Sequence, residues 1–119
     1  MALSSALSGS QVISGDNVSL TFPFSVNDTT ITGYTPVQTY TLSPSQTGVS
    51  VDTCRLSVVK YIVIKTVDGK AVNVKLDALT EDQTYNPLAI ITGNYTAVTL
   101  GNPSSSDTVA VQVQLAGTI

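Results

Sequence analysis

Residues 55–75, RLSVVKYIVIKTVDGKAVNVK, contain the pattern that decides the fold. Apolar and polar residues alternate on both sides of the Val-Asp-Gly turn at 67–69, which is typical of two half-buried strands around a tight loop. A two-residue turn would mix the two faces, whereas a three-residue loop with a left-handed glycine aligns the apolar residues of both strands. Register follows the hydrophobic pattern, so we predict a β-hairpin in which Ile64 opposes Val72 and Ile62 opposes Val74.

The same stretch holds every cation of the chain, which are Arg55, Lys60, Lys65, Lys70 and Lys75. Residues 55–75 carry a net charge of +4, between an N-terminal part of −3 and a C-terminal part of −4. The predicted register places Lys65 and Lys75 on the outer face. Three interpretations stay open: lysines that deter edge-to-edge aggregation, a docking surface for an acidic protein, and a polyanion site.

Similar periodicity predicts an all-β fold for the whole chain. Residues 18–26 alternate without a break, so we expect a strand whose apolar side chains face the core: Val18, Leu20, Phe22, Phe24 and Val26. Pro23 within it indicates an edge strand or a bulge. Further strands are predicted at 30–34, 37–42, 49–51, 56–67, 70–76, 88–91, 95–100 and 109–115. Residues 77–84 suggest at most one helical turn. Short strands at such spacing are typical of a single antiparallel β-sandwich or barrel, jelly-roll-like, of about seven to nine strands.

Composition limits the chemistry. The 119 residues include no histidine, so Ser-His-Asp and Cys-His arrangements and Cys/His zinc sites are excluded. No phosphate-binding loop occurs, and we expect no enzyme activity, no catalytic residue, no metal and no cofactor. The net charge of −3 argues against nucleic-acid binding. The single cysteine, Cys54, is predicted to be a small core residue.

The surface composition favours association. Charged residues make up 11% of the chain, against about 25% in ordinary soluble domains, while 14 Ser and 17 Thr supply most of the polarity. A chain with so few charges has little protection against self-association. We therefore expect a surface that other protein subunits cover.

The N-terminal segment, residues 1–12, is predicted to be an arm preceding a β domain at 13–119. It is small and polar and would not form a core by itself, so we expect a neighbouring subunit to hold it. The candidate interface residues are Met1, Ala2, Leu3, Leu7, Arg55, Lys65 and Lys75. The start lacks a charged region and a long apolar core, so we expect no signal peptide and synthesis in a host cytoplasm. The aliphatic runs are too short to span a membrane.

Three stretches, VDGKAVNVKL (67–76), YNPLAII (85–91) and YTAVTLGN (95–102) with the serine-rich loop after it, resemble small virion proteins of tailed bacteriophages. These families are head-decoration (cement) proteins and base proteins of head spikes. The resemblance covers about residues 58–106 and leaves 1–57 unmatched. It implies a small β-sandwich or barrel that forms trimers or pentamers on a capsid protein, located in the virion.

Two other functions remain as alternatives. One is a ligand-binding β-module, such as a carbohydrate-binding or adhesin domain, in which Tyr34, Tyr40 and Tyr95 could form a stacking platform. The other is a small coat subunit that builds a shell by itself.

Overall fold

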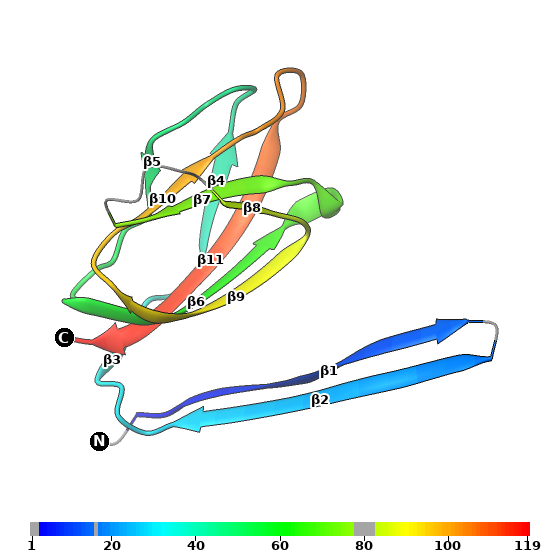
Figure 1. Cartoon of the computed structure of the whole chain (residues 1–119). Coiled ribbons are helices and arrows are strands. Elements are labelled where there is room, and N and C mark those ends of the chain that lie inside the picture. Colours follow the sequence, from blue (N-terminus) through cyan, green and yellow to red (C-terminus); the bar gives the residue numbers. More distant parts are fainter. Residues whose placement is uncertain (1–2, 16, 78–82) are drawn as a thin grey trace. The chain divides into compact units, whose positions relative to one another are not determined.

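The computed structural model describes residues 3–15, 17–77 and 83–119, and this part of the chain is almost entirely β-structure (Figure 1). Its strands are β1 (Ser5–Gly15), β2 (Val18–Asp28), β3 (Gly33–Tyr34), β4 (Gln38–Leu42), β5 (Val49–Ser50), β6 (Val58–Thr66), β7 (Val72–Leu76), β8 (Gln83–Tyr85), β9 (Leu88–Tyr95), β10 (Val98–Gly101) and β11 (Val109–Thr118). One short 3₁₀ turn, η1 (Val67–Gly69), is the helical element among the described residues. The all-β prediction is confirmed, and most of the predicted helical turn at 77–84 lies outside the described residues.

The chain divides into two units, Met1–Ile31 and Thr32–Ile119. The first unit is a hairpin in which β1 and β2 pair antiparallel along their whole length, from Ser5↔Asp28 to Gly15↔Val18. The boundary therefore lies after Ile31 and not after residue 12, because β1 continues past that point. Pro23 lies in β2, which pairs with β1 alone, so the edge-strand prediction is confirmed.

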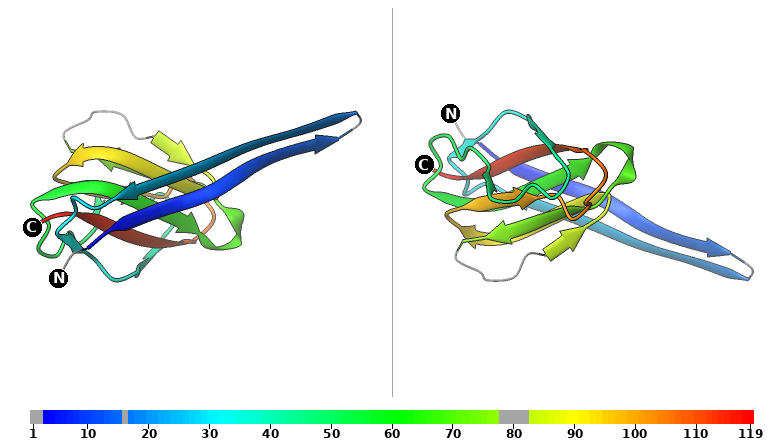
Figure 2. Two further views of the ribbon diagram at one scale, coloured as in Figure 1. Left: turned by 90° about the horizontal axis from the view of Figure 1, so that it is seen from below. Right: turned by 90° about the horizontal axis from the view of Figure 1, so that it is seen from above.

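The second unit is a β-sandwich of two antiparallel sheets (Figure 2). One sheet has the order β5-β10-β7-β8. The other has the order β3-β11-β6-β9, and β4 also pairs with β11. Neither sheet closes on itself, so the unit is a sandwich and not a barrel.

The predicted hairpin between the two strands of residues 55–75 is wrong. β6 pairs with β11 on one side and β9 on the other, so both of its edges are occupied. β7 instead pairs with β10 and β8 in the opposite sheet. The loop at 67–69 is where we predicted it, and Asp68 (φ 65°) and Gly69 (φ 67°) are both left-handed. The turn therefore leads the chain from one sheet to the other.

Most of the core is formed by residues of five strands, β4, β6, β7, β10 and β11. In β11, Val109, Val111, Val113 and Leu115 are buried, as the alternation predicted. The apolar residues of the two strands that flank η1 are also buried, namely Ile62, Ile64, Val72 and Val74. These residues belong to one cluster with Leu42, Val98 and Leu100. Burial was thus predicted correctly for β6 and β7 even though their pairing was not.

Asp77 joins the end of β7 to the segment before β10. Its Oδ1 accepts hydrogen bonds from the backbone N–H of Thr96 (2.6 Å) and of Ala97 (3.0 Å), and from Oγ1 of Thr96 (3.0 Å). These bonds favour the charged form and lower the pKa of Asp77 below its usual value.

The depressed pKa predicts a loss of stability in acid that depends on Asp77. A carboxylate whose pKa is lower in the folded state contributes stability above its unfolded pKa, and that contribution disappears as the pH falls through the folded pKa. Below about pH 4, we expect the urea midpoint of the wild type to decrease with falling pH more steeply than that of Asp77→Asn. Asp68→Asn, at an exposed residue of η1, is the control. An identical acid response of wild type and Asp77→Asn would contradict the prediction.

Candidate assembly surface

The β1–β2 hairpin has two chemically different faces. Residues directly opposite each other on antiparallel strands point to the same side of the sheet. The register therefore places Leu7 with Val26, Gly9 with Phe24 and Gln11 with Phe22 on one side. The other side carries Ser8 with Ser25, Ser10 with Pro23, and Val12 with Thr21.

The first side exposes large apolar side chains, and we call it the apolar hairpin face: Leu7, Leu20, Phe22, Phe24 and Val26. Phe22 is 68% exposed, Leu20 59% and Val26 46%. The prediction that these β2 residues face the core is wrong, because none of them belongs to the buried cluster that the described residues form. Alternation indicated an amphipathic strand correctly, but the two-stranded sheet of β1 and β2 contains no second layer of its own that covers this face.

Phe24 is held by a glycine on the neighbouring strand. A Cβ added to Gly9 would lie 2.9 Å from Cζ of Phe24, so the ring covers the backbone at Gly9. This contact lowers the exposure of Phe24 to 38%. At the base of the hairpin, Oδ1 of Asp28 accepts a hydrogen bond from the N–H of Thr30 (2.7 Å) and fixes the end of β2.

The sandwich has an apolar area of its own on the outer side of the five-stranded sheet. Ile90 pairs with Val63, and Tyr61 pairs with Ala116, which in turn pairs with Tyr34. With Leu88 these residues form the outer-sheet patch: Tyr34, Tyr61, Val63, Leu88, Ile90 and Ala116. Tyr34 is 63% exposed, Leu88 53% and Ile90 41%. An exposed run of apolar residues on a flat sheet is typical of a contact surface.

Lys65 and Lys75 do not share one outer face, as the predicted hairpin would require. Lys65 is exposed on the outer side of the five-stranded sheet, opposite Leu88. Lys75 lies on the outer side of the four-stranded sheet, and Arg55 lies in the loop before β6. Because β6 and β7 belong to different sheets, the outer faces that carry these lysines point away from each other. Nζ of Lys70 donates to the carbonyl oxygen of Thr108 (3.1 Å) and is engaged within the sandwich.

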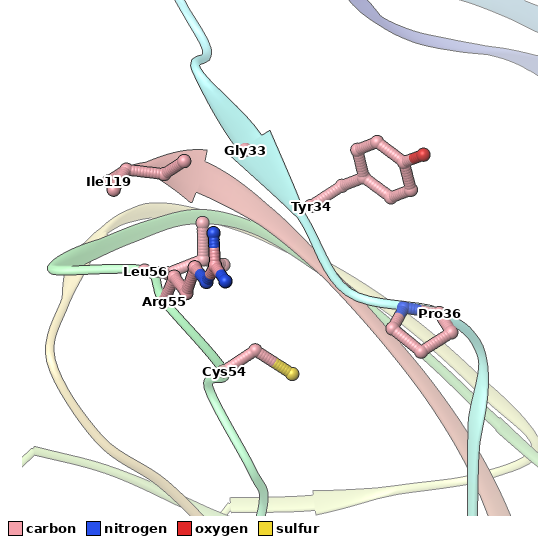
Figure 3. Close-up of a pocket in the computed structure, with 7 residues that line it drawn as sticks. All are labelled: Gly33, Tyr34, Pro36, Cys54, Arg55, Leu56 and Ile119. Atoms are coloured by element: carbon pink, nitrogen blue, oxygen red, sulfur yellow. The ribbon is translucent and has the colours of Figure 1, made fainter.

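A small hollow of about 250 Å³ lies at one end of the sandwich (Figure 3). Its lining residues come from β3, the segment after it, the loop before β6 and the C-terminus, and they are Gly33, Tyr34, Pro36, Cys54, Arg55, Leu56 and Ile119. Ligand sites for small molecules usually have about 300–1,000 Å³. The lining offers one cation and no carboxylate, so it lacks an acid–base pair.

Cys54 lines this hollow, and its prediction as a core residue is wrong. The thiol is free and exposed. The backbone is left-handed at Cys54 (φ 55°), and its N–H donates to Oδ1 of Asp52 (2.8 Å). This turn brings Leu56 into the core in place of the cysteine.

The other predicted interface residues are all in the first unit. Met1 and Ala2 lie outside the described residues. Leu3 is half-buried and precedes β1, and Leu7 is half-buried on the apolar hairpin face. The remaining members of that face, Leu20, Phe22, Phe24 and Val26, were not among the predicted interface residues, because we assigned them to the core. One signal in the sequence could have identified them. Residues 1–17 show no second apolar strand that could build a core with β2.

The described residues contain no group of three or more His, Cys, Asp or Glu side chains that could hold a metal ion. Within the same ranges, no helix is long and apolar enough to cross a membrane. No protein family, curated protein or solved structure matches this chain.

Proposed function

We propose that this protein is a structural component of a protein assembly and uses the apolar hairpin face to bind other subunits. The assembly we propose is the head of a tailed bacteriophage, where the chain would serve as a decoration (cement) or spike-base protein. It would act without catalysis and without a cofactor, alongside further copies of itself and a capsid protein.

The single observation that carries the proposal is the exposure of four large apolar side chains on one face of the hairpin. A two-stranded hairpin is at best marginally stable in water, and three strands or a covering surface are needed to stabilise it. Residues 3–28 contain no lysine or arginine that would keep another protein away. A hairpin of this composition therefore favours a partner that covers its apolar face.

The phage assignment rests on the sequence resemblance of residues 58–106. Mass spectrometry of purified particles from a phage that encodes this sequence should detect the chain in the virion. Its absence from such particles would exclude the virion role and leave the assembly proposal to be tested separately.

A carbohydrate-binding module remains the second candidate, because Tyr34 is 63% exposed beside the hollow. Glycan arrays separate the two functions. Tight, saturable binding of a sugar by the monomeric protein, lost in Tyr34→Ala, would favour the binding module over the structural role.

The structural role predicts that the protein is oligomeric and that Phe22→Ser dissociates it. Burying a phenylalanine contributes about 2 kcal/mol, so each contact should weaken by about 30-fold. Light scattering coupled to size-exclusion chromatography measures the native mass of both proteins.

Val12→Ser is the matched control, because Val12 is 61% exposed on the opposite side of the same hairpin. It should leave the native mass unchanged. A wild-type protein that stays monomeric at high concentration would overturn the assembly proposal.

A further inference from the structure

We infer that the partner of the apolar hairpin face is the outer-sheet patch of a second copy of this chain, so that each copy gives its hairpin to a neighbour and receives one. This inference rests on the proposed assembly function and specifies the surface that the hairpin covers.

The two surfaces are alike in geometry. Both are faces of antiparallel sheets, and two such faces pack about 10 Å apart with their side chains interdigitated. The apolar hairpin face presents two phenylalanines and three aliphatic side chains, of which Leu7 is half-buried. The outer-sheet patch presents Tyr34, Leu88 and Ile90 at its exposed points, with the half-buried Val63 and Ala116 between them. The exposed aromatic rings of one surface would therefore meet a half-buried centre on the other, which also includes Tyr61.

The charges are also compatible. The members of the apolar hairpin face are uncharged, and on the same side Asp28 lies at the base of the hairpin, opposite Ser5, where its Oδ1 accepts hydrogen bonds from Thr30. The outer-sheet patch has Arg55 near Tyr34 at the hollow, and Lys65, which pairs with Leu88 on one side and Gln112 on the other. Their long side chains can extend past the rim to water while the patch is covered. The proposed contact therefore buries no charge that lacks a partner.

The surface area that would be buried favours a mutual exchange of hairpins over a single hairpin contact. If each aromatic side chain supplies about 150–250 Å² and each aliphatic one somewhat less, each surface exposes on the order of 400 Å². One hairpin contact would then bury about 800 Å², below the range of about 1,200–2,000 Å² for specific interfaces. If two copies exchange hairpins reciprocally, both contacts belong to one interface of about 1,600 Å², which is within that range.

Disulfide trapping between two differently tagged copies tests the inference. One copy carries Phe22→Cys and the other Ile90→Cys, both in a Cys54→Ser background that removes the exposed native thiol. The two chains are co-expressed, purified through both tags and oxidised. We expect a disulfide-linked species of two chains on non-reducing gels, and at least a five-fold lower yield when Val12→Cys replaces Phe22→Cys.

Substitutions without cysteine give a second readout. Ile90→Asp should lower the native mass as Phe22→Ser does, because it places a charge in the covered patch. Ser50→Asp, on the exposed outer side of the four-stranded sheet, should leave the mass unchanged.

The outcomes separate this inference from the proposed function. An oligomeric wild type without trapping, or with equal trapping from Val12→Cys, would overturn the exchange and leave the assembly role standing. An oligomer that Ile90→Asp leaves intact would do the same and point to a different protein surface. A monomeric wild type would overturn both.

Discussion

Replacing Gly117 with alanine is expected to lower the free energy of unfolding by about 3 kcal/mol or more, the high end for overpacking of a core. A Cβ at this position would lie 1.9 Å from the carbonyl oxygen of Val58 and 2.9 Å from its carbonyl carbon. Both atoms belong to the backbone, so no side-chain rotation relieves the clash. The strands β11 and β6 would have to separate where they form a bulge between Ala116 and Gly117.

Gly33→Ala is the matched control for this prediction. Gly33 pairs with Gly117 across β3 and β11, so both glycines lie in one sheet. An added Cβ at Gly33 would meet Cγ1 of Ile119 at 2.8 Å and Cδ2 of Leu56 at 3.0 Å. These atoms are the ends of flexible side chains that can move, so we expect a cost of about 1 kcal/mol. Urea unfolding of the three proteins measures the difference, and equal losses for the two variants would show that backbone contact does not decide the effect.

The effect of Gly117→Ala should not depend on assembly. The clash lies inside the sandwich, whereas Phe22→Ser acts on the hairpin. The first variant should therefore lower the urea midpoint and the second the native mass. This separation tests whether the two units of the chain have separate roles.

The sequence predicted the strands and the burial of the sandwich better than it predicted their pairing. Ile62 and Ile64 of β6 are buried with Val72 and Val74 of β7, as the alternation required. The same burial results whether the two strands lie side by side in one sheet or face each other across the core. Hydrophobic periodicity cannot distinguish these arrangements, because both bring the same side chains together. The pairing of β6 is decided by β11 and β9, which are distant in sequence.

The candidate site was predicted in part, for a related reason. An alternating strand has an apolar side, but the pattern does not say which surface covers it. We assigned the apolar residues of β2 to the core, and the structure leaves them exposed on a two-stranded hairpin. β1 was not predicted as a strand, because serine and glycine are poor strand formers and conceal its alternation. Its pairing with β2 is visible from the three-dimensional structure alone.

The sheet faces on which the lysines lie also could not be predicted from the sequence pattern. The predicted hairpin register placed Lys65 and Lys75 on one outer face, but η1 leads the chain from one sheet to the other. Lys65 and Lys75 therefore lie on different outer faces. Of the three interpretations, a single docking surface for an acidic protein or a polyanion loses its geometric basis. Protection against edge-to-edge aggregation loses it as well for these two lysines, because both edges of β6 and of β7 are paired.

Asn102→Asp is expected to destabilise the sandwich by about 3 kcal/mol, because it places a carboxylate against carbonyl oxygens in the core. Asn102 is 3% exposed. Its Nδ2 donates to the carbonyl oxygens of Leu42 (3.2 Å), Ser43 (3.0 Å) and Asp107 (2.7 Å). The amide therefore joins the end of β4 to the serine-rich loop before β11. A carboxylate of the same shape has no hydrogen to donate and repels all three acceptors.

Two comparisons make this prediction specific to the lost donor. Asn73 is the control, because its side chain acts as an acceptor. Its Oδ1 accepts a hydrogen bond from Oγ1 of Thr84 (2.6 Å). Asn73→Asp keeps that acceptor, so its urea midpoint should stay close to that of the wild type. The deficit of Asn102→Asp should also shrink as the pH falls, since protonation of the introduced carboxyl group restores one donor and removes the charge. A deficit that is the same at neutral and acidic pH would mean that altered packing, and not the missing hydrogen bonds, destabilises the variant.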